Sequence, residues 1–214
     1  MNISRSYSSS VRDDAARATE RRIIDAAERL FLENGYGATT VTMIAAAAQV
    51  SKQTVYNSCG SKAELLKRLY DVRLVGDDEP IAFGDRPEIR EMEALTDPRA
   101  LLVAYGRVGG VLLQRLGPLL SVIIAGAHAG DPDLVRHLQT TDAERLIGAA
   151  GVAARLTELK ALRPGLSEDR ARDIIWTMNS VPVWTELTTG RGWSVDEYAN
   201  WIGTAFADLL LPRD

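Results

Sequence analysis

The residues best suited to chemistry in this chain of 214 residues lie together between positions 40 and 62. Four polar side chains recur at i, i+1, i+4 and i+5, which places them on one face of a helix: Lys52, Gln53, Tyr56 and Asn57. A lysine can contact a phosphate or a guanine, and the amides of glutamine and asparagine can pair bidentately with adenine. Thr40 and Lys62 stand at predicted helix N-termini, where free backbone N–H groups favour a phosphate. The pattern indicates a surface that contacts double-stranded DNA.

The remaining residues with reactive or metal-binding side chains are isolated in the sequence. The single cysteine, Cys59, excludes an internal disulfide framework and a four-cysteine zinc module, and it is either a redox-active or nucleophilic group or a small apolar side chain. His128, Asp131 and Asp133 are close enough for a metal site, but capping of the next helix already accounts for Asp131. His137 is expected on an exposed helix surface. We therefore expect no enzyme, no cofactor and no metal.

Large side chains in the second half of the chain indicate either a core or a pocket in a helical body. Most such residues are core, but a pocket for a small molecule is lined by the same types with a few polar groups. The candidate ligand-binding residues are Tyr105, His128, Trp176 and Met178. We expect the pocket to favour an apolar or aromatic molecule.

Helical periodicity dominates the sequence, and no segment shows the period-two alternation of a strand. Four helices are predicted in the first third of the chain: residues 19–34, a short helix after Thr40, a third from Ser51 to about Ser58, and a fourth over 61–75. Gly35 ends the first helix, and Ser61 with Glu64 forms a capping box for the fourth. The spacing of the second and third helices fits a helix-turn-helix and a generic helical hairpin equally well.

A second set of helices is predicted beyond the turn-forming residues that start at Gly76, at 98–116, 118–128, 132–161, 168–181 and 195–210. Pro98 and Pro132 each follow an aspartate, as is typical of the first helical position. Pro118 separates two of these helices, and Pro182 must bend or end another. The last two carry apolar residues on more than one face, which favours a homodimer.

The composition, with 25% charged and 46% hydrophobic residues, is that of an ordinary globular protein. The net charge of −4 divides into +3 over residues 1–75 and −7 over residues 76–214, as expected when one module contacts a polyanion. The most apolar stretch, Leu116 to Gly130, contains Pro118 and falls short of the ~20 residues that cross a bilayer. We expect no membrane partner, and a single cysteine fits a cytoplasmic location.

The segment that begins at Arg22, RIIDAAERLFLENGYGATTVTMIAAAAQVSKQTVYNSCGSKAELL, resembles the DNA-binding domain of the tetracycline-repressor (TetR) family. The matching pieces are AAERLFLENGYGATT, IAAAAQVSKQTVY and SKAELL, within roughly residues 19–70. The resemblance implies an all-α bacterial transcriptional regulator, usually a repressor. Members are homodimers with a three-helix helix-turn-helix domain and a helical ligand-binding and dimerisation domain, and they release a palindromic operator when a small molecule binds.

The Ser-rich N-terminal sequence predicts a flexible arm over residues 1–18. The resemblance implies a DNA-binding domain over 19–76 and an effector-binding and dimerisation domain over 77–214. The predicted DNA-binding residues are Thr40, Ser51, Lys52, Gln53, Thr54, Tyr56, Asn57 and Lys62, with Thr40 and Lys62 on phosphates. Three positions depart from the family pattern: Gln49 replaces a glycine of the turn, Ser58 a His or Tyr, and Cys59 an aromatic residue.

Three classes of function compete on the sequence alone. A ligand-responsive transcriptional regulator explains the whole pattern. An enzyme with a helical body would need a nucleophile–base pair or a metal cluster, which the sequence does not display. A helix-turn-helix protein that has no effector, or that serves as an adaptor for other proteins, would share the DNA-binding residues but not the pocket.

Overall fold

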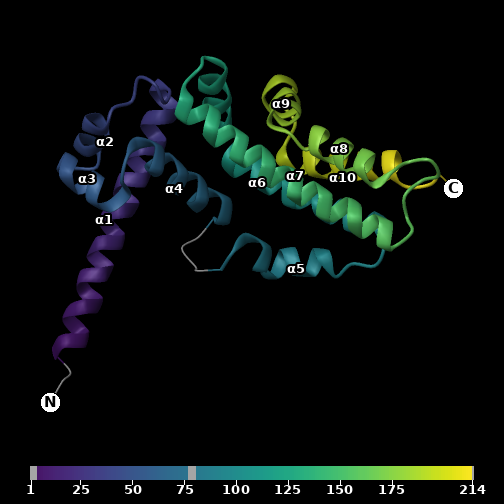
Figure 1. The fold of residues 1–214 in the computed structure, drawn as a ribbon, viewed down its shortest axis with the longest axis horizontal. Helices are drawn as coiled ribbons and strands as arrows, with labels where there is room; N and C mark the ends of the chain where they lie inside the picture. The colour runs from purple at the N-terminus through teal and green to yellow at the C-terminus, as the bar shows by residue number, and fades with distance from the viewer. Residues whose placement is uncertain (1–3, 77–80, 214) are drawn as a thin grey trace. The chain divides into compact units, whose positions relative to one another are not determined.

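The computed structural model describes residues 4–76 and 81–213, with the backbone alone described for residues 4–13. Every regular element within these residues is a helix (Figure 1), so the predicted all-α fold is confirmed. The chain divides into two compact units. The first consists of Met1–Arg73 and Val122–His137, and the second of Leu74–Ser121 and Leu138–Asp214.

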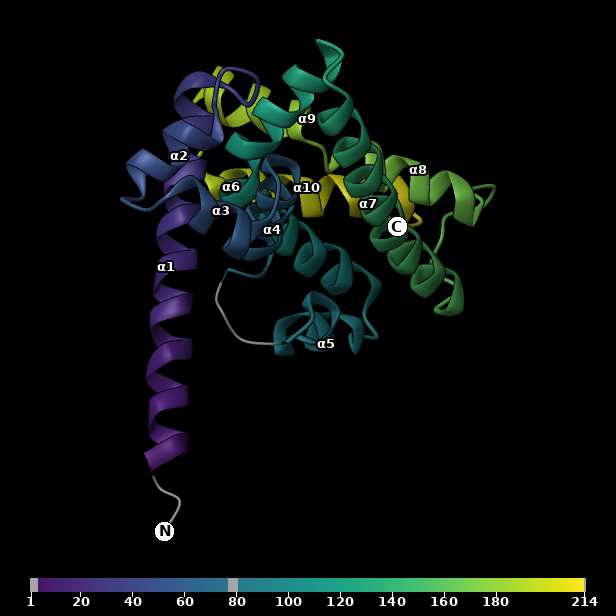
Figure 2. The same ribbon diagram turned by 60° about the vertical axis from the view of Figure 1, so that its left-hand side comes forward.

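The first unit contains the four helices predicted for the front of the chain: α1 (Ser4–Asn34), α2 (Val41–Ala47), α3 (Lys52–Cys59) and α4 (Lys62–Val75). The end of α1 is as predicted, because Gly35 adopts a φ of 78° and its N–H bonds to the carbonyl of Phe31. Its start differs from the prediction. Figures 1 and 2 draw α1 as one continuous helix from Ser4, where a flexible arm was expected. Residues 4–18 contain neither proline nor glycine, so nothing in the sequence interrupts the helix there.

The core of the first unit forms where α1 contacts α2 and α3. One apolar face of α1 is buried, with Ile23, Ala27 and Phe31 fully inaccessible. Ion pairs add to the packing of α4 on α1, because Arg73 bonds to Glu28 through two of its nitrogens. The DNA-binding helices therefore form one packed body with α4.

The second unit contains most of the remaining helices: α5 (Pro87–Glu93), α6 (Pro98–His128), α7 (Pro132–Glu158), α8 (Glu168–Met178), α9 (Val181–Thr185) and α10 (Val195–Leu210). A 3-10 turn spans Phe83–Asp85 and a π-helical turn spans Glu186–Gly190. The last residues of α6 and the first of α7 belong to the first unit. The division is thus not the single boundary near residue 76 that the sequence suggested.

The separation of two helices at Pro118 is wrong, because α6 continues through this proline. A proline inside a helix leaves the carbonyl four residues earlier without its N–H donor. Pro118 and Gln114, which carries that carbonyl, are both exposed, so water reaches the carbonyl and the helix tolerates the loss. Two other predicted helices end early, α7 at Glu158 and α8 at Met178, and Pro182 falls in the first turn of α9.

The core of the second unit is built on close contacts between α6 and α10. Tyr198, Ile202 and Phe206 of α10 are fully buried. A Cβ added to Gly106 of α6 would lie 2.7 Å from the backbone nitrogen of Gly203, so the two backbones meet at a pair of glycines. Within the described residues only α6 has the length and mean hydropathy of a membrane span, but core helices share these properties and 44% of its most apolar window is buried.

Candidate DNA-binding site and effector-binding residues

The helix-turn-helix is positioned by two polar N-caps that were predicted from the sequence. Thr40 accepts a hydrogen bond from the N–H of Met43 at 3.2 Å, and Ser51 accepts one from the N–H of Thr54 at 3.0 Å. Each bond satisfies an amide that has no partner within its helix. These caps fix the first turns of α2 and α3, and both capping side chains remain exposed.

The turn between α2 and α3 requires a left-handed residue, and this chain places Gln49 there with a φ of 56°. The N–H of Val50 reaches back to the carbonyl of Ala45 at 2.9 Å, which is the closure typical of a helix that ends in a left-handed residue. A side chain in this conformation costs roughly 1–2 kcal/mol relative to the right-handed region. Gln49, which stands where the family pattern has glycine, therefore carries backbone strain.

Helix α3 separates a buried face from an exposed one. Val55 and Cys59 pack into the core, and burial raises the pKa of the Cys59 thiol. A buried thiol that stays protonated is a poor nucleophile, so the role of a small apolar side chain is favoured at this position. The opposite face carries the four residues predicted to meet DNA, all exposed: Lys52, Gln53, Tyr56 and Asn57.

Two of the exposed residues on α3 are already paired with each other. The amide nitrogen of Gln53 donates to the side-chain oxygen of Asn57 at 2.8 Å. This bond holds the two amides side by side on one turn of helix, and it uses neither the oxygen of Gln53 nor the nitrogen of Asn57. Such an arrangement offers both an acceptor and a donor to the edge of a base pair.

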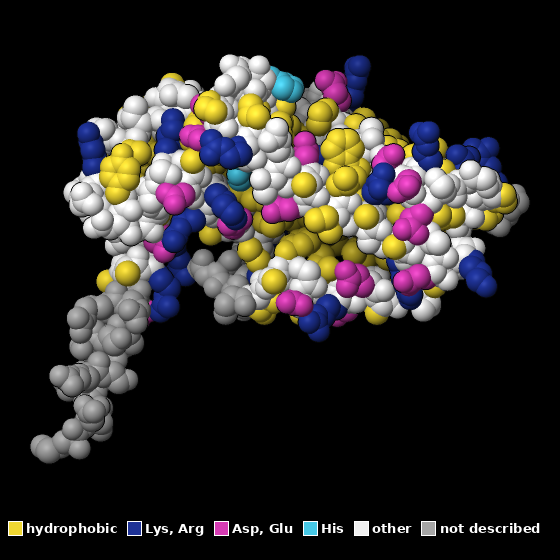
Figure 3. Space-filling model, viewed as in Figure 1, with side chains coloured by type: hydrophobic (Ala, Val, Ile, Leu, Met, Phe, Trp, Pro, Cys, Tyr) yellow, Lys and Arg dark blue, Asp and Glu magenta, His cyan; other side chains and the backbone are white. Residues whose placement is uncertain are grey.

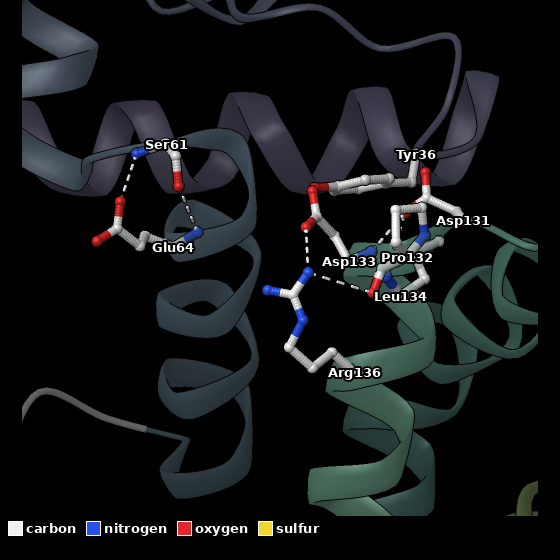
Figure 4. Close-up of polar contacts among 8 residues, drawn as sticks. All are labelled: Tyr36, Ser61, Glu64, Asp131, Pro132, Asp133, Leu134 and Arg136. Carbon is white, nitrogen blue, oxygen red and sulfur yellow. Dashed lines mark hydrogen bonds and ion pairs between the residues drawn. The ribbon is translucent and has the colours of Figure 1, made fainter.

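Lys62 lies at the start of α4 as predicted, but its ammonium group also has a structural role. It donates to the carbonyl of Tyr36 at 2.9 Å and to that of Thr39 at 3.1 Å, and it lies 4.0 Å from the centre of the Tyr36 ring. An ammonium group carries three donors, so one remains for a phosphate. The capping box of Ser61 and Glu64, drawn in Figure 4, starts this helix as predicted.

Tyr36 and Thr39 were not identified from the sequence. Thr39 is fully buried, and its hydroxyl lies within hydrogen-bonding distance of the carbonyls of Leu30 and Gly35. The hydroxyl of Tyr36 donates to the carboxylate of Asp133 on α7 at 3.3 Å (Figure 4). Burial and the negative charge of Asp133 raise the pKa of Tyr36, so its hydroxyl remains a donor.

The aspartates near the start of α7 are used for capping and packing. Asp131 accepts hydrogen bonds from the amides of Asp133 and Leu134, as the capping prediction required. Asp133 contacts Tyr36 and also Arg136, whose guanidinium lies 3.1 Å away (Figure 4). His128 is exposed at the C-terminal end of α6. No group of three or more potential metal ligands occurs among the residues of known placement.

His137, expected on the surface, is instead half-buried between α7 and α4. Its ring packs edge-on against Tyr70 with 5.1 Å between ring centres, and its Nε2 is buried without a hydrogen-bond partner in the described structure. Burial, together with the nearby charge of Lys67, lowers the pKa of this imidazole below its usual value. The contact joins α4 and α7 within the first unit.

The four candidate ligand-binding residues are divided between the two units. His128 belongs to the first, and Tyr105, Trp176 and Met178 belong to the second. Trp176 lies under the guanidinium of Arg145 at 5.1 Å, and its indole N–H donates to the carbonyl of Asp142. On the face seen in Figure 3, hydrophobic side chains gather in a hollow beside α5.

The first unit also contains an open groove of about 380 Å³ between α1 and the end of α2. None of the predicted DNA-binding or ligand-binding residues line it. Its lining residues are Arg22, Asp25, Ala26, Arg29, Ala47, Ala48 and Gln49.

Comparison with known proteins supports the helix-turn-helix as part of a DNA-binding domain. Residues 23–69 match the family model described as bacterial regulatory proteins, tetR family, and no curated protein matches the chain. These residues contain the whole helix-turn-helix, so the resemblance predicted from the sequence is confirmed. The class that this match defines is a DNA-binding domain of the kind found in bacterial regulatory proteins of the tetR family, over residues 23–69.

Solved structures share the fold over almost the whole chain. The SmeT–triclosan complex superposes with a TM-score of 0.70 at 20% identity, covering 91% of this chain and 92% of SmeT. NalD, the secondary repressor of the MexAB-OprM multidrug efflux pump in Pseudomonas aeruginosa, superposes with a TM-score of 0.70 at 20% identity. The match covers 92% of this chain and 97% of NalD. A putative TetR-family regulator from Mesorhizobium loti superposes with a TM-score of 0.57 at 23% identity. The match covers 92% of this chain and 98% of that regulator. At these identities the likeness establishes the fold.

Proposed function

We propose that the protein is a repressor that binds a palindromic operator as a homodimer and releases it when a small apolar or aromatic molecule binds. The observation that carries the DNA-binding part is the exposed face of α3, where Lys52, Gln53, Tyr56 and Asn57 stand opposite the buried Val55 and Cys59. A helix with this division of faces suits the major groove.

A second set of groups, at the N-termini of the DNA-binding helices, is placed to bind phosphates while α3 contacts the bases. Thr40 and Ser51 are exposed at the N-termini of α2 and α3, where backbone amides favour an anion. One donor of Lys62 remains free beside them. In a two-fold dimer these groups would meet two half-sites whose centres lie about one helical turn or more apart.

Two similar structures support the regulatory part of the proposal. NalD is the secondary repressor of a multidrug efflux pump, and the SmeT structure is a complex with triclosan. In this chain, the hydrophobic hollow beside α5 and the aromatic residues of the second unit suit an apolar effector. We place the effector-binding and dimerisation functions in residues 77–214 and DNA binding in residues 19–76.

Release of DNA requires that the effector bind more tightly to the DNA-incompetent state. Helix α4 is the proposed lever, because it is packed on α1 through Arg73 and ends the DNA-binding segment. Helices α6 and α7 provide a second connection, because each contributes residues to both units. The hydrogen bond between Tyr36 and Asp133 joins the tip of α7 to the turn that precedes α2.

Selection of bound sequences from random duplex DNA by the purified protein tests the proposal. We expect an inverted repeat to be enriched and its affinity to fall steeply with salt, because phosphate contacts release counterions. Recovery of no common sequence, with binding equally tight to every duplex, would contradict the proposed operator recognition.

A further inference from the structure

A buried polar cluster in the second unit indicates which chemical group the effector carries, and the inference rests on the proposed function. The cluster consists of Tyr105 on α6, Asn179 at the end of α8 and Tyr198 on α10. Gly109 of α6 makes room for it, because a Cβ added there would lie 2.6 Å from the amide nitrogen of Asn179. A Cβ added at the next residue, Gly110, would lie at an ordinary contact distance of 3.8 Å from the ring of Tyr198.

Two polar atoms of this cluster have no hydrogen-bond partner among the described residues. They are the side-chain oxygen of Asn179 and the hydroxyl of Tyr198, both buried. Tyr198 is 0% exposed, so solvent at the surface does not satisfy its hydroxyl. Buried polar groups in native proteins nearly always have a partner, because leaving one unpaired costs free energy. Each of the two atoms is therefore free to take a further hydrogen-bonding partner.

The protonation of the cluster defines its donors and acceptors. Burial raises the pKa of Tyr105, and the hydrogen bond with the side chain of Asn179 lowers it. A bond that lowers the pKa of a phenol is donated to its oxygen, so the amide nitrogen of Asn179 is used and the amide oxygen is the free acceptor. Burial also raises the pKa of Tyr198, which keeps its hydroxyl a donor.

The charges around the cluster argue against an ionic ligand group. Arg145 lowers the pKa of both tyrosines, so its field opposes a second cation. Three of its five N–H donors are used by Asp142 at 2.8 Å and by the carbonyls of Trp176 and Asn179 at 2.9 and 3.0 Å. An anion at the cluster would face the unpaired oxygen of Asn179.

We propose that Asn179 and Tyr198 bind the hydroxyl group of a neutral, mainly apolar effector, such as an alcohol or a phenol. The ligand hydroxyl donates to the side-chain oxygen of Asn179 and accepts from the hydroxyl of Tyr198. One hydroxyl supplies both interactions, whereas an ether or a hydrocarbon of the same size lacks the donor.

The test compares 2-naphthol with naphthalene and 2-methoxynaphthalene, which share one ring system and differ in the hydroxyl. Dissociation constants are measured calorimetrically with the full chain. Two hydrogen bonds predict that 2-naphthol binds about tenfold more tightly than either analogue. Tyr198→Phe removes only the free hydroxyl, and we expect it to reduce the ratio to about threefold or less.

Trp184→Phe is the matched control, because the indole nitrogen of Trp184 is also buried without a partner but its ring contacts α6 at Gly117. We expect this variant to keep the preference for 2-naphthol. Three results would each overturn the inference: equal affinities of the wild type for the three probes, no binding of 2-naphthol at its solubility limit, or a preference lost in Trp184→Phe and kept in Tyr198→Phe.

Titration of the same proteins with the selected duplex separates this inference from the proposed function. If the wild type binds its operator and does not discriminate among the probes, the hydroxyl site is wrong and DNA recognition stands. If the probe preference depends on Tyr198 but 2-naphthol leaves operator affinity unchanged, the site stands and the proposed release of DNA is wrong.

Discussion

Gln49 holds a left-handed backbone conformation that glycine adopts at lower cost. We predict that Gln49→Gly raises the free energy of unfolding by about 1 kcal/mol, since the relief of strain exceeds the added entropy of the unfolded chain. Urea unfolding measures the change. Ala46→Gly is the control: Ala46 is exposed within α2, and the substitution is expected to lower stability by about 0.5–1 kcal/mol. A lower free energy of unfolding in Gln49→Gly would contradict the backbone strain assigned to Gln49.

Lys62 is predicted to contribute to folding as well as to DNA binding. Lys62→Met keeps the aliphatic stem but removes the bonds to the carbonyls of Tyr36 and Thr39, so we expect a loss of about 1–3 kcal/mol in the free energy of unfolding. Lys52→Met is the matched variant, because Lys52 is exposed on α3, and its stability should change by no more than about 0.5 kcal/mol. Both variants should bind all DNA sequences more weakly. Equal stabilities would show that the Lys62 bonds contribute nothing.

Part of the site was predictable residue by residue, and part was not. The outward residues of α3 follow from helical periodicity, and the caps Thr40 and Ser51 follow from local sequence. Tyr36 was missed because its partners, Lys62 and Asp133, lie 26 and 97 residues away in the chain. Only a fold brings such groups together, so no local pattern could have found them.

At the scale of the elements, the contact of α4 with α7 at His137 predicts that the stability of the folded protein depends on pH. The pKa of His137 lies below the ordinary 6.5 in the folded protein, so the unfolded chain binds its proton more readily. Stability from this residue is complete above about pH 6.5 and is lost as the pH falls through the folded value. The groups that face it from α4 are Tyr70, Lys67 and Asp71.

His137→Phe tests this contact, because it keeps an aromatic ring against Tyr70 and removes the titration. We expect the melting temperature of the wild type to fall more between about pH 7.5 and about pH 5.5 than that of the variant. An equal fall in the melting temperatures of the two proteins would mean that protonation of His137 does not destabilise the folded protein.

Caps and glycines located the helix ends that the sequence predicted well. Helix α10 starts at residue 195 as predicted, where Ser194 and Glu197 form a capping box, and Gly35 ends α1. Pro118 misled the prediction because the effect of a proline depends on whether water reaches the carbonyl that it leaves unpaired. Helix α5 was missed, although Pro87 at its first position and the buried Ile89 and Met92 were local signals.

At the scale of the whole molecule, we predict a dimer in solution with twice the monomer mass of 23.4 kDa. The apolar surface proposed on α10 is smaller than the sequence suggested, because Ile202 and Phe206 are already buried within one chain. Leu209 is 37% exposed on α10, so Leu209→Glu should shift the mass measured by light scattering towards the monomer.

Ile147 on α7 is 73% exposed and provides the matched substitution. Ile147→Glu should leave the dimer intact if α10 forms the interface. A monomer from Ile147→Glu together with a dimer from Leu209→Glu would move the interface to α7. A monomeric wild type would contradict the dimer itself and the palindromic operator that depends on it.

The central claim is that the exposed face of α3 reads the operator, and base preference tests it most directly. Affinities are measured for the selected operator and for all its single-base variants, with the wild type, Gln53→Ala, Asn57→Ala and Thr40→Ala. We predict that Gln53→Ala and Asn57→Ala each lose about 1–3 kcal/mol of discrimination at symmetric positions of the two half-sites, whereas Thr40→Ala weakens all sequences alike. Full base preference retained in both Gln53→Ala and Asn57→Ala would contradict the assignment of α3 as the recognition helix.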